Sequence, residues 1–231
     1  MTQSMALYRP AGMIMLILAT TACAPNEARQ AASSQDVAAY PEAHYQRLQE
    51  QGRKVLHVDA SQSLVAIEVR RAGALARFGH DHVVASHDIK GDVSPQEGRA
   101  DLLIRLDQLT VDEAGLRAQA GFDTQPTPED IAGTRHNMLA KVLEADRYPY
   151  ALVRIERLGK TDTLRVAITL HGQTQTYQVP ATIESTADRM MVSGTMHFNQ
   201  SDFGIVPYSV LNGALRVQDG LDLRFRIDAH T

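Results

Sequence analysis

Tryptophan is absent from this sequence, aromatic residues make up only 5% of it, and cysteine occurs once. A single cysteine excludes an intrachain disulfide, so no covalent cross-link holds the fold together. The sequence also lacks a strong excess of either charge. Its formal net charge is −4, and acidic and basic residues are interspersed without a basic stripe. This pattern argues against a nucleic-acid partner. The chain also lacks a glycine-rich phosphate loop and a nucleophile elbow, two common signatures of enzymes.

The first two dozen residues carry a targeting pattern. Arg9 precedes an apolar run at residues 11–19, and the small residues 20–22 follow it. A short charged region, an apolar segment too short to span a bilayer and a small-residue cleavage site are typical of a secretory signal. We therefore expect residues 1–22 to be a signal peptide.

Cys23 follows this signal directly, and the stretch resembles the processing site of bacterial lipoproteins, in which the cysteine becomes the lipidated N-terminus. The match departs from the usual pattern because Thr20, not leucine, stands three residues before the cysteine. The alternative is ordinary cleavage near Ala22, which releases a free protein. The resemblance implies a lipid anchor on the periplasmic side of the cell envelope, and Ala24 in place of aspartate favours the outer membrane. Two or more acyl chains would anchor the protein stably.

Composition divides the rest of the chain into two parts. Residues 23–52 are rich in Ala, Gln, Glu and Ser, which predicts a lipidated N-terminus and tether, with room for a short helix near residues 41–51. We expect residues 53–231 to form one domain, which is large enough to bury a sizeable core.

Alternating segments dominate this domain. In the last one, Leu221, Leu223, Phe225 and Ile227 share one face, and charged residues occupy the other. Side chains of a strand point to opposite faces with a period of two, so one face is buried and the other is wet. Other strands are expected at 54–59, 63–71, 73–92 with bends at Gly79 and Gly91, 99–110, 150–158, 162–171, 173–183 and 189–198. Many strands joined by short turns predict a closed antiparallel barrel or a sandwich.

One helical segment interrupts the strands. Thr127 and Pro128, followed by Asp130, indicate an N-cap with proline in the first turn and an acid three residues on. An amphipathic stripe follows and ends before Pro149; its members are Ile131, Met138, Leu139, Val142 and Leu143. A shorter helix is expected at residues 113–120.

Four blocks of the domain together resemble the YceI-like family, bacterial periplasmic proteins that bind lipids or polyisoprenoids. The blocks are DIAGTRHNM at residues 130–138, Tyr148-Pro149, TLHG at residues 169–172 and QSDFGI at residues 200–205. Each block alone is a weak signal, whereas their order and spacing are fairly specific. The resemblance covers residues 54–230, essentially the whole domain.

The resemblance implies a mainly β fold, a lipocalin-like extended antiparallel eight-stranded barrel with one helical excursion. It also implies a pore that sequesters or transports a long-chain amphiphile of polyisoprenoid, quinone or fatty-amide type, with no catalysis and no required cofactor. An eight-stranded barrel is either filled by side chains or holds one small ligand, so a packed structural or stress-related envelope protein stays an alternative. The methionines suit a ligand, because their side chains conform to irregular apolar shapes.

His80 and His82 suggest a second hypothesis, a metal-dependent enzyme or redox accessory. On a strand their imidazoles share a face and lie about 6.6–7 Å apart, so they could ligate Zn²⁺, Cu²⁺ or Fe²⁺. A metal needs a further ligand, and the remaining candidates fit poorly: His87, His197 and Asp81 have the opposite parity, His171 lies at a turn and His136 on a helix.

This lack of a third ligand weakens the metal hypothesis. His80 and His82 could instead bond to each other, to backbone or to water at the pore mouth. We favour contact with the polar head of a ligand such as a quinone, since an imidazole N–H can donate to a carbonyl oxygen in an apolar pocket.

The predicted ligand contacts lie on interior faces or beside them: Phe78, His80, His82, Val84, Met138, Met190, Val192, Met196, Phe198, Phe203 and Phe225. Cys23 is the predicted lipidation site, and His80 and His82 are the only metal candidates. Expected partners are a long-chain lipid or quinone, and the membrane through the N-terminal anchor. The sequence leaves the oligomeric state open, with a homodimer among the options.

Overall fold

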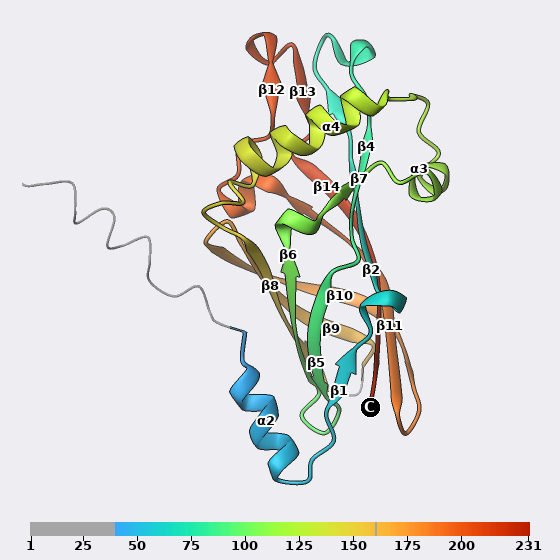
Figure 1. Cartoon of the computed structure of the whole chain (residues 1–231), viewed down its shortest axis with the longest axis vertical. Coiled ribbons are helices and arrows are strands. Elements are labelled where there is room, and N and C mark those ends of the chain that lie inside the picture. The colour runs from blue at the N-terminus through green and yellow to red at the C-terminus, as the bar shows by residue number, and fades with distance from the viewer. Residues whose placement is uncertain (1–39, 160) are drawn as a thin grey trace, which may run out of the picture. The chain divides into compact units, whose positions relative to one another are not determined.

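The computed structural model describes residues 40–159 and 161–231, so the predicted signal peptide, Cys23 and most of the predicted tether lie outside the described residues. Within them, eight antiparallel strands follow one another in the order β1, β5, β6, β8, β9, β10, β11 and β14. β14 then returns to pair with β1 and closes the sheet into a barrel (Figure 1). The mainly β, lipocalin-like eight-stranded barrel predicted from the sequence is confirmed.

The strands of the barrel have the following bounds: β1 (Leu56–Val58), β2 (Leu64–Val69), β4 (His82–Ser86), β5 (Ile89–Ser94), β6 (Arg99–Arg105), β7 (Thr110–Val111), β8 (Tyr150–Arg157), β9 (Thr163–Leu170), β10 (Gln173–Ser185), β11 (Arg189–Asn199) and β14 (Gly220–His230). A small second sheet joins β3 (Arg71–Ala72), β12 (Ser209–Val210) and β13 (Leu215–Val217).

Three of the barrel strands are broken along their length. A 3₁₀ turn at Ala60–Gln62 separates β1 from β2, and both parts pair with β14. β4 and β5 are also two parts of one strand of the barrel: β4 pairs with β2, and β5 pairs with β1. A 3₁₀ turn at Leu106–Gln108 separates β6 from β7, and β7 pairs only with β4 among the described strands. No ladder therefore joins β7 to β8 among the described strands.

The single strand predicted over residues 73–92 is wrong. β3 ends at Ala72, and Gly73, with a φ of +96°, turns the chain out of the barrel before it returns as β4. A Cβ on Gly73 would lie 2.4 Å from the carbonyl oxygen of Ala214, so a side chain there would collide with the neighbouring loop. The predicted bend at Gly91 is also wrong, because Gly91 lies inside β5, where a Cβ would meet Leu102 and Val58.

The predicted helix after Thr127 is confirmed as α4 (Pro128–Asn137), which continues into a π-helical turn at Met138–Val142. The Thr127 hydroxyl accepts the Asp130 N–H, and the Asp130 carboxylate accepts the Thr127 N–H, which completes the expected cap. Arg135 donates to the carbonyl oxygens of Leu109 and Asp107 at 3.0 and 2.5 Å. These bonds hold α4 across the barrel end at which β7 lies (Figure 1).

The fold holds more helix than the one excursion that the resemblance implies. α3 (Ala114–Ala120) places Leu116 on the outer face of the barrel, against Ala66, Val83 and Ala85. α2 (Glu42–Glu50) precedes the first strand, and its buried Tyr45 and Leu48 pack with Val55. The packed part of the chain therefore includes residues that composition assigns to the tether. None of the helices within residues 40–159 and 161–231 is long and apolar enough to cross a membrane.

Two buried carboxylates on the outside of the barrel hold α2 and Tyr40, two residues before the helix, in place. The Tyr45 hydroxyl donates to Asp101 at 2.7 Å, and the Tyr40 hydroxyl donates to Asp92 at 2.5 Å. Asp101 also accepts bonds from Arg99 and Arg154. Burial alone would raise the pKa of Asp101, but these hydrogen bonds outweigh it and hold the pKa below its ordinary value.

Acid is expected to loosen α2 from the barrel. A carboxyl group whose pKa is lower in the folded protein contributes stability above its unfolded pKa of about 3.9, and this stability is lost as the pH falls through the folded pKa. Amide exchange in residues 42–50, corrected for the intrinsic effect of pH, should therefore speed up near pH 3 relative to pH 7. In an Asp101→Asn variant the exchange should already be faster at neutral pH and should depend less on pH. Equal protection of α2 at both pH values in the wild type would contradict the expectation.

Candidate functional site

The barrel encloses a cavity of about 460 Å³. The inward faces of its strands line it almost entirely with aliphatic side chains, because alternate residues of each strand point inward. On β9 these residues are Leu164, Val166, Ile168 and Leu170, and on β14 they are Leu221, Leu223, Phe225 and Ile227. The volume lies within the usual range of about 300–1,000 Å³ for ligand pockets. The barrel is therefore hollow, which contradicts the alternative of an interior filled by side chains.

The two ends of the barrel differ. Near the C-terminal end of β14, Leu56, Val93 and Ala229 are buried together with Met190 packed against them, and none of the four lines the cavity. At the other end, the exposed side chains of Phe78, Val210 and Arg216 line the cavity and meet solvent at the same time. The cavity is thus blocked by packed side chains at the first end and open at the second.

Polar side chains gather at the open end. His80 lies just before β4, and His82 is the first residue of that strand. Asp130, Thr134 and Asn137 come from one face of α4. Residues three and four apart share a helix face, which explains why these three meet the cavity together. The two imidazole rings lie 6.0 Å apart between centroids, with their planes at 75°. An apolar cavity with a few polar groups at one end is suited to a ligand with a polar head and an apolar tail.

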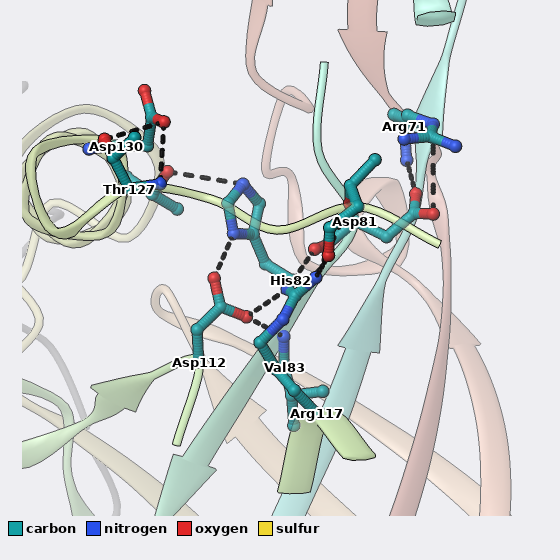
Figure 2. Close-up of polar contacts among 10 residues, drawn as sticks. Arg71, Asp81, His82, Val83, Asp112, Arg117, Thr127 and Asp130 are labelled. Atoms are coloured by element: carbon teal, nitrogen blue, oxygen red, sulfur yellow. Dashed lines mark hydrogen bonds and ion pairs between the residues drawn. The ribbon is translucent and has the colours of Figure 1, made fainter. Parts of the chain in front are cut away.

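His82 is held by a buried network (Figure 2). Its Nδ1 lies 2.6 Å from the Asp112 carboxylate, which also accepts the Val83 N–H at 2.9 Å and Arg117 Nη1 at 2.8 Å. Burial alone would raise the pKa of Asp112, but these bonds outweigh it and keep the pKa below its ordinary value. An ionised carboxylate can only accept, so Nδ1 carries the proton, and Nε2 lies 3.3 Å from the Thr134 hydroxyl.

His80 lies beside this network without belonging to it. It is half-buried and lines the cavity, and no hydrogen bond of its side chain occurs among the residues that the structure describes. Its ring nitrogens are therefore available to a molecule in the cavity mouth. His82 is fixed in orientation by Asp112, whereas the His80 ring nitrogens bond to no protein group within residues 40–159 and 161–231.

Within residues 40–159 and 161–231, no group of three or more His, Cys, Asp or Glu side chains is placed to hold a metal ion. Three of the candidate third ligands have other partners among the described residues. His87 bonds to Glu113 and His197 to Asp222, both on the outside of the barrel. Asp81 accepts the Arg71 N–H and points away from the His82 ring (Figure 2). His197 lies on β11 and faces outward as its parity predicts, whereas Asp81 and His87 flank β4 and belong to no strand.

Eight of the eleven predicted ligand contacts line the cavity: Phe78, His80, His82, Val84, Met138, Met196, Phe198 and Phe225. Three do not. Met190 belongs to the packed end of the barrel, and Val192 packs in the cluster around Leu164 and Val179. Phe203 is fully buried and packs against Phe198 without lining the cavity. The sequence reasoning missed Asp130 and Thr134, although their spacing of four on a predicted helix gives one polar face.

Ser86 is a further polar residue of the cavity that sequence reasoning missed. It is 1% exposed and lines the cavity, and its hydroxyl has no hydrogen-bond partner among the described residues. Strand parity places Ser86 on the same face as Val84 and His82, so its inward position could be predicted. A serine in an alternating strand is common, however, and does not by itself indicate a binding residue.

A closed eight-stranded antiparallel barrel with an apolar cavity and a polar mouth is the architecture of a lipocalin-like protein. The profile of the YceI-like domain matches residues 56–229. The chain therefore belongs to the YceI-like family, a family of binding proteins.

Two solved structures share the fold. A polyisoprenoid binding domain from Saccharophagus degradans, implicated in plant cell wall breakdown, is 14% identical, with a TM-score of 0.55 over 76% of this chain and 98% of that one. BcnA of Burkholderia cenocepacia is 16% identical, with a TM-score of 0.53 over 74% of this chain and 98% of that one. At such identities the likeness shows the fold alone. No curated protein matches the chain significantly.

Proposed function

We propose that this protein binds one long-chain amphiphile of the polyisoprenoid class and sequesters or transports it in the cell envelope without catalysis. The observation that carries the proposal is the cavity, which is aliphatic along the barrel, blocked at one end and polar only at its mouth. A long apolar tail gains roughly 25 cal/mol for each Å² that it removes from water. Quinones and fatty amides have the same division into head and tail and are included in the proposal.

The name of the Saccharophagus degradans domain supports this ligand class, because that protein is described as polyisoprenoid-binding and shares the barrel. We place the polar head of the ligand at His80 and His82. His82 is held by Asp112, so the ligand head would meet one fixed and one freely available imidazole. An imidazole N–H donates well to a carbonyl or phosphate oxygen in such surroundings.

Native mass spectrometry, with lipid extraction and metal analysis of the same sample, tests the proposal. The expected result is one co-purifying long-chain lipid per chain without stoichiometric metal. A stoichiometric transition metal would instead support the enzyme or redox hypothesis for His80 and His82. A protein that carries no lipid, and takes up none when offered a long-chain polyprenol in detergent, would overturn the proposal.

His80→Ala is expected to weaken ligand retention while leaving the fold intact. One neutral hydrogen bond contributes about 0.5–1.5 kcal/mol, so the lipid retained should fall roughly three- to tenfold. The matched control is His87→Ala, which removes an imidazole that bonds to Glu113 on the outside of the barrel. Quantitative extraction from both variants gives the comparison, and equal retention would show that the head does not contact His80.

The envelope location of the protein rests on residues 1–23, and we propose a lipid anchor at Cys23 facing the periplasm, with the outer membrane favoured. Because Cys23 is the only cysteine, thioether-linked lipid on the chain can be attributed to it. Metabolic labelling with palmitate should mark the wild type and not Cys23→Ala, and only the wild type should enter the detergent phase on partitioning. An unlabelled wild type, cut near Ala22, would contradict the anchor and leave the ligand proposal untouched.

A further inference from the structure

The open end of the barrel carries an exposed apolar tip, defined here as residues 71–80 and 204–217. Among the described residues, large hydrophobic side chains that are clearly exposed occur at five positions, and four belong to this tip. Phe78, Val206 and Leu211 are 65%, 82% and 66% exposed, and Val210 accompanies them. Only Tyr150 lies elsewhere. Large side chains gathered at one place on a surface mark a contact site, in contrast to scattered ones.

The two segments of the tip are fixed to each other. The Leu75 N–H donates to the Ala214 carbonyl oxygen at 2.8 Å, and β3 pairs with β13, which in turn pairs with β12. Figure 1 shows β12 and β13 standing beside the loop between β3 and β4 at the same end as α4. The exposed apolar groups are therefore presented on a hydrogen-bonded frame and do not depend on a loose loop.

The charges of the tip have one sign. Residues 71–80 and 204–217 contain no aspartate or glutamate, although the whole chain has a net charge of −4. They contain Arg71, Arg77 and Arg216. Arg71 is paired with Asp123, whereas Arg77 lies over the Phe78 ring at 4.7 Å, and Arg77 and Arg216 are exposed and make no ion pair with any described residue. From the π-helical turn after α4, Lys141 adds a further cation 5.7 Å from the Tyr208 ring, and Asp130 is the one acidic residue among the described residues that line the cavity.

We propose that this tip docks onto an anionic lipid bilayer, with Phe78, Val206 and Leu211 entering the interface and Arg77 and Arg216 facing the lipid headgroups. Apolar side chains flanked by arginines are the groups that favour such an interface, since burial of the former and attraction of the latter add. The cavity mouth lies in the tip, because Phe78, Val210 and Arg216 also line the cavity. Docking therefore brings the mouth to the membrane, which goes beyond the ligand binding proposed above and would let a lipid pass without crossing water.

A single-tryptophan reporter tests the docking, because the natural chain has no tryptophan. Val206→Trp in the full chain places the indole at the tip outside the cavity lining, and Tyr150→Trp is the matched control on the other exposed site. With vesicles containing phosphatidylglycerol, the Val206→Trp emission should shift to shorter wavelength and be quenched by lipids brominated in their acyl chains. The control emission should not change. Vesicle binding through residues 1–39 is common to both reporters and does not produce this difference.

The charge of the tip is tested in the same reporter chain. Adding Arg77→Gln should lower the vesicle affinity about fivefold, and purely zwitterionic vesicles should bind more weakly still. Equal quenching at both reporter positions, or none at Val206→Trp, would overturn the proposal. A blue shift that depends on protein concentration without vesicles would also overturn it, and would identify a second copy of the chain as the occupant. Val206→Ser should retain lipid like the wild type, so a failure of docking is distinguishable from a failure of ligand binding.

Discussion

Replacing Asp112 by alanine is expected to destabilise the barrel by about 3–5 kcal/mol, the usual cost of removing one partner from a buried ion pair. The Asp112 side chain is fully buried, and its carboxylate bonds to His82, to the Val83 N–H and to Arg117. Without it, the Arg117 guanidinium keeps its charge next to β4 with less compensation. Alanine also tolerates the backbone poorly there, since Asp112 has a φ of +59°.

Urea unfolding followed by circular dichroism measures this loss directly. Asp107→Ala is the matched control, because Asp107 pairs with Arg105 in an exposed position and its removal should cost less than about 1 kcal/mol. If Asp112→Ala does not fold, Asp112→Asn separates the charge from the shape: asparagine accepts the left-handed backbone and keeps one carbonyl oxygen for the Val83 N–H. A free energy of unfolding for Asp112→Ala within 1 kcal/mol of the wild type would show that the network does not stabilise the fold.

The regular part of the barrel could be predicted because a period of two is a local property. β11 and β14 show this directly: Met196 pairs with Leu223 and Phe198 with Leu221, and all four line the cavity as their parity predicts. The same parity placed His197 outside, where it bonds to Asp222. Parity assigns a face to each residue of a regular strand, and this was sufficient for the walls of the cavity.

Depth along the barrel could not be predicted in the same way. Met190 and Val192 follow the parity of Met196, but Met190 belongs to the end that is blocked by Leu56 and Ala229. Which end of a strand is packed depends on the closed sheet around it, and Leu56 of β1, which pairs with β14, lies more than a hundred residues from Met190 in the chain. A residue pattern within one strand does not contain that information.

The partner of His82 was also beyond sequence reasoning. Asp112 lies 30 positions from His82 and directly after β7, at the place where the barrel opens. The need for glycine at position 73 could not be predicted either, because the backbone that excludes a side chain there belongs to Ala214, a residue far along the chain. The mouth of the cavity is built from such loop contacts, whereas the walls are built from regular strands. Residues that bind a tail could therefore be predicted better than residues that meet a head.

Filling the cavity should abolish most of the ligand binding, and neighbouring residues of β9 allow a controlled test. Ile168 lines the cavity, while Ala167 precedes it on the same strand and faces outward. Ile168→Trp places an indole where the ligand tail is proposed to lie. A side chain that competes for a filled space costs about 1–3 kcal/mol, and about 1.4 kcal/mol corresponds to a tenfold change, so retained lipid should fall about tenfold or more.

Ala167→Trp adds the same indole to the outer face and should retain lipid like the wild type. In the absence of ligand, Ile168→Trp should unfold at a urea concentration close to that of the wild type, because the cavity of about 460 Å³ has room for the larger side chain. Lipid extracted per mole of folded protein provides the comparison. Equal lipid in the two variants would place the ligand outside the barrel. A loss confined to Ile168→Trp, with the fold intact, would mean that the interior of the barrel is where the tail is bound.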